Sequence, residues 1–371
     1  MELLERIKSL IDCPVRVAQS KVVEALSGKN ILIYGAGSFG REMLALLKRS
    51  RIDVKAFLDV NAKAIGSVDG TAVYRLEDYD STRENTVVIF SIVCDKDLRR
   101  TIIDGINAAG FECVIEAQSI RCLSVCFTES YNGKTAFGQI NKAYSLLSDQ
   151  KSREIFLNNI YAHFSGDYSC CEKYEEPMSE QYFPENIPFA KDYSVFVDCG
   201  GYIGDTAEAV LKKYKPKKVV SFEPFIGNYK KMSENCAKYK GSGTEFYLYN
   251  NAVSDKTKLC CFAEGTGSGS LSDSGEITVV SVSLDQALPC FRPTFIKMDI
   301  EGEEYNAIIG ASEIIRDSMP DMAICVYHSI DDIWRLPLLI DSIKSGYSYY
   351  LRSYNSYTME TVLYAVKRSE A

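Results

Sequence analysis

The sequence predicts an α/β protein that contains two Rossmann-like units in succession. Two segments support this prediction, because each runs from an apolar strand through a glycine-rich turn into a helix, and then into a second strand that ends in a carboxylate. The residues that mark the two segments are Gly35, Gly37, Gly40 and Asp59 in the first and Gly200, Gly201, Gly204 and Glu223 in the second. In both segments the acid follows the last glycine by the same 19 positions.

The first unit is the smaller one. Its apolar runs predict strands at 31–34, 54–58, 86–92 and 111–116, and its helical patterns predict helices at 41–50 and 98–109. Two further helices, at 143–149 and 152–164, and a polar segment at 165–192 separate it from the second unit. We expect four regions: an N-terminal helix at 1–27, a small Rossmann-like domain at 28–120, a helical connector with loops at 121–190, and a second domain at 191–371.

The second unit is expected to be a larger sheet with helices on both faces. Its predicted strands are 195–197, 219–222, 244–248, 295–298, 322–327, 347–352 and 361–367, with a helix at 205–214 after the first of them. The glycine and serine run at 265–270 is typical of a flexible hairpin tip, so we expect a strand pair around it.

Composition excludes several classes of protein. The 371 residues carry a formal net charge of -8, which argues against general nucleic-acid binding. No apolar run reaches the roughly 18 residues of a membrane span, and the N-terminus lacks a signal-peptide core. The cysteines form no C-x-x-C pair, and Cys13, Cys94 and Cys325 lie within or beside apolar runs, as expected of reduced thiols in a cytoplasmic protein.

The turn of the second unit suits a nucleoside ligand that lacks phosphates. Its D-x-G-G-x-x-G pattern places Asp198 at the end of a strand, where the carboxylate can meet an ammonium group directly or through water, and its glycines allow the backbone to approach the ligand. Glu223 ends the next strand and can accept two hydrogen bonds from a ribose diol. Asn251 and Ala252 follow the third strand, where they either frame the base or form a simple turn.

These residues resemble the FkbM methyltransferase family. Five blocks carry the resemblance in the family's order: Asp198 to Gly204, Ser221 to Pro224, Asn251 to Asp255, Ile296 to Glu304, and Tyr327 to Trp334. Over residues 180–367 the resemblance implies a class I methyltransferase sheet, S-adenosylmethionine as methyl donor, and O-methylation of sugar or polyketide hydroxyls, often in polysaccharide biosynthesis. Gly201 stands where the family often has alanine, a difference that we expect to matter little because both residues are small.

A hydroxyl acceptor must lose its proton as the methyl group is transferred. Asp299 and His328 each end an apolar strand, and we expect His328 to be the general base while Asp299 orients the imidazole or holds the acceptor. This scheme needs no metal. The alternative, by analogy with metal-dependent O-methyltransferases, is a divalent cation held by Asp299 and Glu301 together with Glu304. Asp299 and Glu301 could instead simply cap a helix, with Glu304 in solvent.

The first unit has the dinucleotide fingerprint at Gly35, Gly37, Gly40 and Asp59. It resembles small domains that bind nucleotide sugars, and the alternatives are a structural or acceptor-positioning role and redox use of NAD. Two functions thus compete: an O-methyltransferase with a small-molecule or carbohydrate acceptor, and a non-catalytic scaffold that binds a nucleotide sugar. We also expect residues 170–190, with Tyr182 and Phe183, to form a lid. The sequence does not set the oligomeric state.

Overall fold

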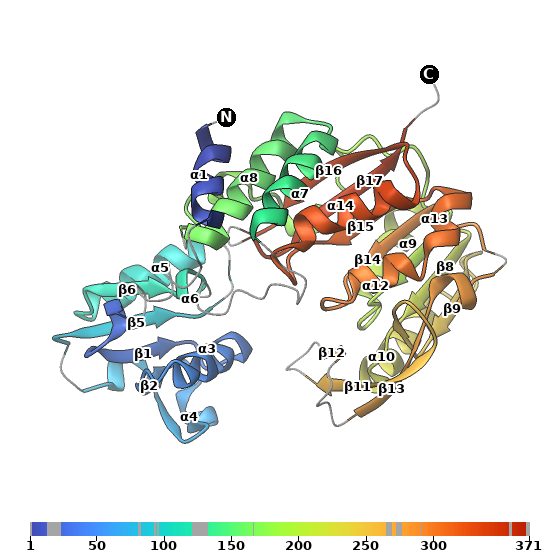
Figure 1. The fold of residues 1–371 in the computed structure, drawn as a ribbon. Helices are drawn as coiled ribbons and strands as arrows, with labels where there is room; N and C mark the ends of the chain where they lie inside the picture. Colours follow the sequence, from blue (N-terminus) through green and yellow to red (C-terminus); the bar gives the residue numbers. More distant parts are fainter. Residues whose placement is uncertain are drawn as a thin grey trace. The chain divides into compact units, whose positions relative to one another are not determined.

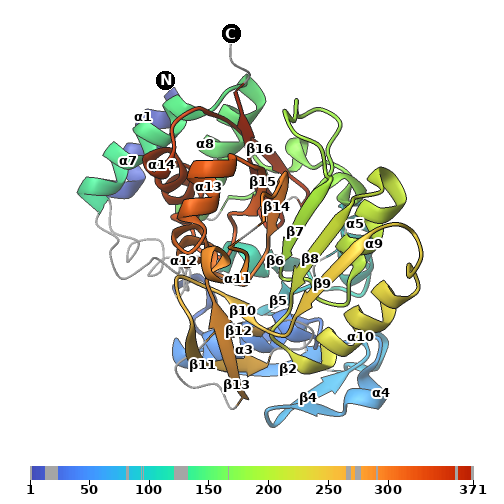
Figure 2. The same cartoon turned by 90° about the vertical axis from the view of Figure 1, so that its right-hand side faces the viewer.

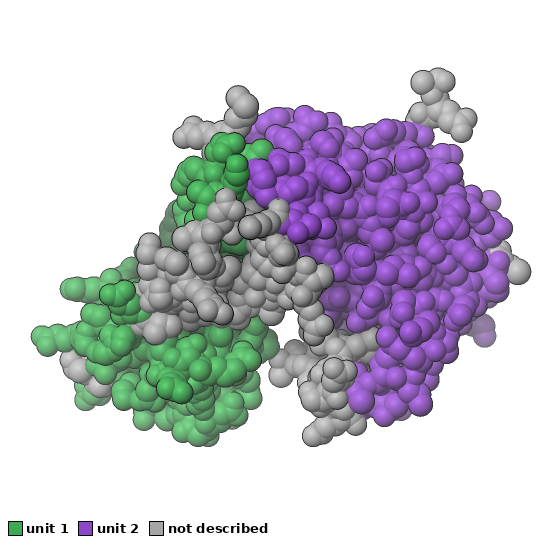
Figure 3. All heavy atoms as spheres, viewed as in Figure 1, with its two compact units in different colours: residues 1–126, 157–173, 355–358 green, residues 127–156, 174–354, 359–371 purple. Residues whose placement is uncertain are grey.

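The computed structural model describes residues 2–12, 24–80, 83–92, 94, 96–120, 133–165, 167–264, 269–271, 277–289, 291–355 and 358–368. The chain divides into two compact units, which Figure 3 shows in different colours. Unit 1 consists of residues 1–126, 157–173 and 355–358, and unit 2 consists of residues 127–156, 174–354 and 359–371.

Unit 1 is built on a six-stranded sheet with the strand order β3-β4-β2-β1-β5-β6 (Figure 1). The strands are β1 (Asn30–Tyr34), β2 (Val54–Leu58), β3 (Ser67–Val68), β4 (Thr71–Tyr74), β5 (Thr86–Phe90) and β6 (Cys113–Glu116). Its helices are α1 (Glu2–Asp12), α3 (Ser38–Arg49), α4 (Ala62–Ile65), α5 (Lys96–Ala108) and α6 (Ala117–Ile120), and a 3-10 turn covers Leu76–Asp78. The β3–β4 pair is antiparallel and the other neighbouring strands are parallel.

Alternating side chains of the central strand β1 divide the core of unit 1 into two layers. Ile31 and Ile33 pack with Met43 of α3, whereas Leu32 packs with Ile106 of α5. Successive residues of a strand point to opposite faces, so this division places the two helices on opposite faces of the sheet.

Unit 2 is built on a seven-stranded sheet with the order β16-β17-β15-β14-β7-β8-β9. Its strands are β7 (Val195–Cys199), β8 (Lys218–Phe222), β9 (Glu245–Tyr249), β14 (Phe295–Met298), β15 (Asp321–Cys325), β16 (Tyr347–Ser353) and β17 (Thr361–Lys367). The strands from β15 to β9 are parallel, and β17 runs antiparallel to both β15 and β16. Aromatic side chains fill the core around β7 and β14, with Phe196 stacked on Phe295.

Helices cover both faces of this sheet. Figure 2 shows α12, α13 and α14 on one side and α9 and α10 on the other. The helices of unit 2 are α7 (Gly133–Leu146), α9 (Asp205–Tyr214), α10 (Ile226–Ala237), α11 (Leu284–Ala287), α12 (Glu304–Ile309), α13 (Ser312–Ser318) and α14 (Asp332–Ile343), while α8 (Gln150–Ser165) contributes residues to both units. The predicted fold class, two α/β units of which the second has helices on both faces, is therefore confirmed.

A smaller four-stranded sheet, in the order β10-β13-β11-β12, belongs to unit 2 as well. Its strands are β10 (Ala252–Val253), β11 (Lys258–Glu264), β12 (Gly269–Leu271) and β13 (Ile277–Val282). Strands β11 and β12 form the expected antiparallel pair, but β12 begins within the glycine and serine run, at Gly269. Residues 265–268 of the run lie outside the described residues.

The structure departs from some of the other sequence expectations, and some of them fall outside the described residues. The segment before β7 contains 3-10 turns at Glu172–Tyr174 and Met178–Glu180, where the sequence indicated only loops. The β3–β4 hairpin was not predicted at all. Cys13 and residues 121–132 of the expected connector lie outside the described residues. Within the described ranges, no helix is both long enough and apolar enough to cross a membrane.

Candidate active site

Three neighbouring parallel strands of unit 2 bring the loops that the sequence analysis singled out to one edge of the sheet. Lys297 on β14, Asp198 on β7 and Ser221 on β8 lie side by side in register. Because parallel strands end at the same edge of a sheet, the segments that follow these three strands meet there. A cavity of about 350 Å³ opens at this edge, which is within the usual size range of small-molecule sites.

The glycine loop of unit 2 is packed too tightly for side chains. Gly200 has a φ of +83°, and a Cβ atom there would come within 1.9 Å of the carbonyl oxygen of Asp299. At Gly201 a Cβ atom would lie 2.6 Å from Sδ of the buried Met232, so the exchange of alanine for glycine is less neutral than the sequence suggested. Gly204 has a φ of +86° and precedes α9. The loop is therefore held directly against β14 and α10.

Asp198 forms a buried ion pair with a lysine that the sequence analysis missed. Nζ of Lys297 lies 3.1 Å from Oδ1 of Asp198 and donates a hydrogen bond to the carbonyl oxygen of Gly200 (2.6 Å). Burial raises the pKa of Asp198 to about 6, although the charge of Lys297 opposes this rise. Lys297 lines the cavity, whereas Asp198 is not among the described residues that do. The lysine thus ties the acid to the glycine loop, and a contact between Asp198 and a ligand ammonium would need rearrangement or a water.

Glu223 lines the cavity and holds the loop at the same time. Its Oε2 accepts a hydrogen bond from the backbone N–H of Tyr202 and its Oε1 accepts one from Phe225, both at 2.9 Å. A carboxylate oxygen has two acceptor positions, so each oxygen retains one for a ligand hydroxyl. Burial raises the pKa of Glu223 to about 6, despite the stabilising backbone hydrogen bonds and the charge of Lys297. The position fits the predicted role in binding a ribose diol.

Asn251 and Ala252 line the same cavity. The side chain of Asn251 donates to the carbonyl oxygen of Val280 (3.1 Å), and Ala252 pairs with Ser281 in the small sheet. This anchoring fixes the loop after β9 beside the cavity. It agrees with a framing role for a ligand base more than with a simple exposed turn.

Asp299 marks the other end of the cavity. Its Oδ2 accepts a hydrogen bond from the hydroxyl of Tyr182 (2.8 Å) and its Oδ1 accepts one from Tyr327 (3.3 Å). Burial disfavours its charge, but Lys297, His328 and Tyr182 together lower the pKa of Asp299. Asp299 is therefore an ionised and firmly oriented carboxylate in the cavity wall.

Glu360 is a second acid at this end, and the sequence analysis did not single it out. It lines the cavity, and its Oε2 accepts a hydrogen bond from Nε2 of Gln181 (2.5 Å). Its backbone has a φ of +57°, which is uncommon for a residue other than glycine and is often found at functional sites. Burial and the charge of Asp299 raise the pKa of Glu360. Glu360 lies in the turn before β17 and belongs to no sequence motif, so only the folded structure shows that it lines the cavity.

The segment that was expected to form a lid is built into the wall of unit 2. Gln181 and Tyr182 line the cavity, and the carbonyl oxygen of Gln181 accepts a hydrogen bond from the buried Tyr364. Phe183 is 5% exposed and packs edge-on against Tyr193. The aromatics thus close one side of the cavity, and hydrogen exchange on adding ligand remains the test of whether they move.

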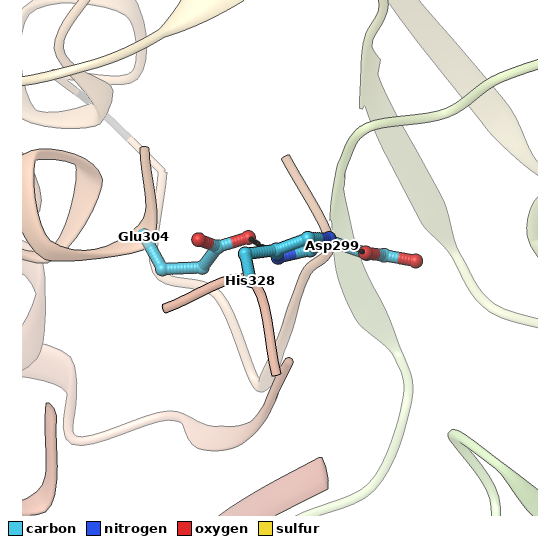
Figure 4. A group of neighbouring side chains, drawn as sticks. All are labelled: Asp299, Glu304 and His328. Carbon is cyan, nitrogen blue, oxygen red and sulfur yellow. Dashed lines mark ion pairs between the residues drawn. The ribbon is translucent and has the colours of Figure 1, made fainter. Parts of the chain in front are cut away.

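His328 is surrounded by carboxylates. Its Nδ1 lies 3.1 Å from Oε1 of Glu304, and its Nε2 lies 3.6 Å from Oδ1 of Asp299 and 3.5 Å from Oε2 of Glu301. Figure 4 shows the imidazole between Glu304 and Asp299. Burial would lower the pKa of His328, but Glu304, Asp299 and Glu301 raise it to about 10.

This environment does not favour the expected role of His328 as the general base. An imidazole with that pKa carries its proton at neutral pH, and among the described residues His328 does not line the cavity. Asp299 and Glu301, which His328 contacts, do line it. The position suits a residue that orients Asp299. The sequence analysis expected the reverse, with Asp299 orienting the imidazole of His328.

The glycine loop of unit 1 is closed by its own acid. Oδ2 of Asp59 accepts a hydrogen bond from the N–H of Ala36 and Oδ1 accepts one from Asn61, both at 2.8 Å. A Cβ atom at Gly40 would lie 1.9 Å from the carbonyl oxygen of Gly35, so this glycine allows α3 to pack on the loop. Gly37 precedes α3 and has open space around it. These contacts agree with both a nucleotide site and a purely structural turn.

The strand order and the cavity of unit 2 define the class of protein. Counted in chain order, the strands of the sheet follow the order third, second, first, fourth, fifth, seventh and sixth from one edge, with one antiparallel strand. This is the strand order of the class I methyltransferase sheet that the sequence predicted. The protein is therefore an S-adenosylmethionine-dependent methyltransferase. Residues 198–349 match the methyltransferase FkbM domain.

One of the similar solved structures shares this fold over nearly the whole chain. The crystal structure of methyltransferase FkbM from Methylobacillus flagellatus KT is 19% identical, covers 98% of this chain and 99% of its own, and has a TM-score of 0.76. A candidate rRNA methylase from Clostridium thermocellum is 8% identical, with 49% and 91% covered and a TM-score of 0.32. M. jannaschii TYW2, in complex with AdoMet, is 16% identical, with 49% and 72% covered and a TM-score of 0.29. The search of curated proteins found no match.

Proposed function

We propose that this protein transfers the methyl group of S-adenosylmethionine to a hydroxyl of a sugar or polysaccharide precursor. The observation that carries the proposal is the acceptor end of the cavity, where the carboxylates of Asp299 and Glu360 and the phenols of Tyr182 and Tyr327 meet. Ionised carboxylates accept strong hydrogen bonds from hydroxyls, and phenols both donate and accept. Such a wall suits a polyhydroxylated acceptor better than an apolar one.

The donor end of the cavity has the groups that S-adenosylmethionine requires. Gly200 allows close backbone approach, Glu223 offers its two free acceptor positions to the ribose diol, and Asn251 and Ala252 lie where the base would rest. S-adenosylmethionine supplies a methyl group activated by its positively charged sulfonium. Asp205, Glu223 and Glu303 line this cavity and give it an acidic character that matches a cationic donor.

Glu360 is the group that accepts the proton of the hydroxyl in this proposal. The oxygens of Asp299 already receive the two tyrosine hydroxyls, and the pKa of Asp299 is lowered, which makes it a weak base. Glu360 faces the same cavity with a raised pKa, and efficient general bases have pKa values near the working pH. The O–H bond breaks toward Glu360 while the methyl–oxygen bond forms and the methyl–sulfur bond breaks. Asp299 then holds and orients the acceptor.

The competing function is a non-catalytic scaffold that binds a nucleotide sugar through unit 1. The complete set of cavity residues in unit 2 supports the enzyme, because a scaffold has no need of Glu223, Asp299 and Glu360 in one cavity. The deciding experiment supplies the full-length protein with methyl-labelled S-adenosylmethionine and a panel of free and nucleotide-linked sugars. We expect label in a sugar product that is heavier by one methylene group. Binding of a nucleotide sugar without any label transfer across the panel would favour the scaffold.

A further inference from the structure

Three acidic side chains converge on His328 in unit 2. Glu304 is fully buried, the side chain of His328 is 10% exposed, and those of Asp299 and Glu301 are 23% and 38% exposed. Within the described part of the chain, the buried Oε2 of Glu304 has no hydrogen-bond partner. Both ring nitrogens of His328 are buried too and lie 3.1–3.6 Å from carboxylate oxygens, without a well-aligned hydrogen bond. Buried polar atoms are nearly always satisfied, so these atoms call for a partner.

Charge balance points to the nature of that partner. Glu304, Asp299 and Glu301 bring three carboxylates to one imidazole. Burying carboxylates without compensating positive charge is strongly unfavourable. Lys297 compensates the charge of Asp299, so the remaining carboxylates favour one further positive charge here. It is either a proton on His328 or a metal ion between the side chains.

The spacing of the ligand atoms fits a metal ion. Asp299, Glu304 and His328 can each offer one ligand atom so that all three atoms lie within 4.8 Å of one another. A cation with bonds of about 2.0–2.3 Å separates its ligand atoms by roughly 3–4.5 Å. The contact of 3.1 Å between Nδ1 of His328 and Oε1 of Glu304 lies in that range. The contact of 3.6 Å to Asp299 is made by the opposite ring nitrogen, Nε2, so an ion would use one nitrogen only.

Hydrogen bonds hold two of the three side chains, Asp299 and Glu304, in place before any ion arrives. Asp299 follows β14, its N–H donates to the carbonyl oxygen of Cys199 (3.1 Å), and its Oδ2 is fixed by Tyr182. Glu304 begins α12 and its Oε1 accepts a hydrogen bond from the N–H of Ile300 (2.9 Å). A site whose ligands are oriented by such contacts loses little freedom when it binds a cation.

We propose that Asp299, Glu304 and His328 form a binding site for a divalent cation that takes mixed oxygen and nitrogen ligands, with Mn²⁺ as its representative. Two carboxylates favour hard cations such as Mg²⁺ and Mn²⁺, and the imidazole shifts the preference toward the transition metal. The sequence suggested Asp299 and Glu301, together with Glu304, as metal ligands. The structure adds His328 to Asp299 and Glu304, and Glu301 lines the cavity with its Oε2 3.5 Å from Nε2 of His328.

The role of this cation rests on the proposed function. Asp299 lies both in the cation cluster and in the wall of the acceptor cavity, so an ion bound to it would lie next to the acceptor hydroxyl. A divalent cation there lowers the pKa of the hydroxyl and aids its deprotonation. Binding of the ion itself does not depend on which acceptor the enzyme uses.

The test is binding of Mn²⁺ alone to the full-length protein, without donor or acceptor. We expect the electron paramagnetic resonance signal of free Mn²⁺ to fall until one ion is bound per chain, and we expect the bound ion to show magnetic coupling to an imidazole nitrogen. His328→Ala should abolish the nitrogen coupling, and H328A and Glu304→Gln should each weaken Mn²⁺ binding at least tenfold. Glu313→Gln, at an exposed acid of α13 that belongs neither to the cluster nor to the described lining of the cavity, is the matched control and should bind like the wild type.

Absence of saturable binding to the wild-type protein, or equal affinity and nitrogen coupling in H328A, would overturn the proposal. The wild-type measurement keeps the test meaningful even where a variant folds poorly, and binding of S-adenosylmethionine to each variant reports whether its fold is intact. Failure of the proposed function gives a different pattern: Mn²⁺ binds through His328 while no sugar receives a methyl group.

Discussion

In unit 1, Asp59 follows Gly40 by the same 19 positions that separate Glu223 from Gly204 in unit 2, and each carboxylate accepts a backbone N–H from its own glycine loop. The surroundings differ. The loop of unit 2 adjoins the buried Lys297–Asp198 ion pair and a cavity that is also lined by residues from other strands. In unit 1, the carboxylate of Asp59 accepts hydrogen bonds from the backbone N–H groups of Ala36 and Asn61 and so closes the loop. The shared spacing thus specifies the turn, and the residues contributed by more distant strands specify the ligand.

The largest effect should come from the glycine that the packing of unit 2 requires. Gly200→Ala forces a Cβ atom to within 1.9 Å of a backbone oxygen at a φ of +83°. The left-handed conformation and the overpacking together should cost about 3–4 kcal/mol of unfolding free energy. Urea unfolding followed by hydrogen exchange would measure this loss and assign it to unit 2.

Gly37→Ala in unit 1 is the matched control. Gly37 has open space at its Cβ position and a φ of -73°, and it precedes α3 much as Gly204 precedes α9. We expect a loss below about 1 kcal/mol, the usual size of a change at a helix cap. Equal losses for both variants would mean that the two loops are packed alike and that the comparison is wrong.

The next effect should appear in turnover. Glu360→Gln removes the proposed proton acceptor but keeps the shape and the neighbouring Gln181. We expect the turnover number to fall about 100-fold, the typical contribution of general-base catalysis, while the Kd of S-adenosylmethionine stays within about twofold. Single-turnover methyl transfer, measured over a range of pH, is the appropriate assay.

A loss of the acidic limb of the pH–rate profile in Glu360→Gln would distinguish a base from a residue that only shapes the cavity. His328→Ala serves as the comparison. If H328A rather than E360Q removes that limb, then His328 is the base, as the sequence first indicated, and its position outside the cavity lining does not prevent catalysis.

A smaller effect is expected for the two acids of the glycine loops. Glu223→Ala removes hydrogen bonds to the ribose diol and should weaken binding of S-adenosylmethionine by about 1.5–3 kcal/mol. Asp59→Ala should leave this binding unchanged, because Asp59 belongs to unit 1. Calorimetry with both variants gives the comparison, and wild-type affinity in Glu223→Ala would remove Glu223 from the donor site.

Local patterns predicted the fold of unit 2 well because its strands are strongly apolar. The strands Phe295–Met298 and Thr361–Lys367 and the helix Asp205–Tyr214 have the predicted bounds. The β3–β4 hairpin was missed because its strands are short, although the Asp69-Gly70 turn, with positive φ at both residues, is a recognisable hairpin signal.

The site could be predicted only in part. Glu223 and Asp299 end strands, so the chain order alone places them at the same edge of the sheet. Lys297 gave one usable signal that was overlooked: a lysine inside the apolar strand around β14 has to be paired if it is buried. Glu360 and Tyr182 gave none, because they reach the cavity from segments 178 residues apart in the chain, and only the folded sheet brings them together.

The smallest effect is a pH dependence of donor binding in unit 2. Burial raises the pKa of Glu223 to about 6, so the carboxylate is ionised at pH 7 and becomes protonated below pH 6. Protonation removes an acceptor of the ribose hydroxyls, and the affinity for S-adenosylmethionine should fall by up to tenfold for each pH unit below 6. Lys297 faces Glu223 and keeps its charge throughout, because its own pKa is raised.

Unfolding would not explain such a loss. A carboxyl whose pKa is higher in the folded than in the unfolded protein favours the folded state most at low pH, so Glu223 contributes more stability at pH 5 than at pH 7. Calorimetry between pH 5 and 8 on the wild type and on Glu223→Gln separates the possibilities. The variant should bind more weakly at pH 8 and show a flat profile. If its affinity still falls below pH 6, the titrating group is Asp198, whose pKa is also raised to about 6, and the buried pair rather than the ribose acid controls the donor loop.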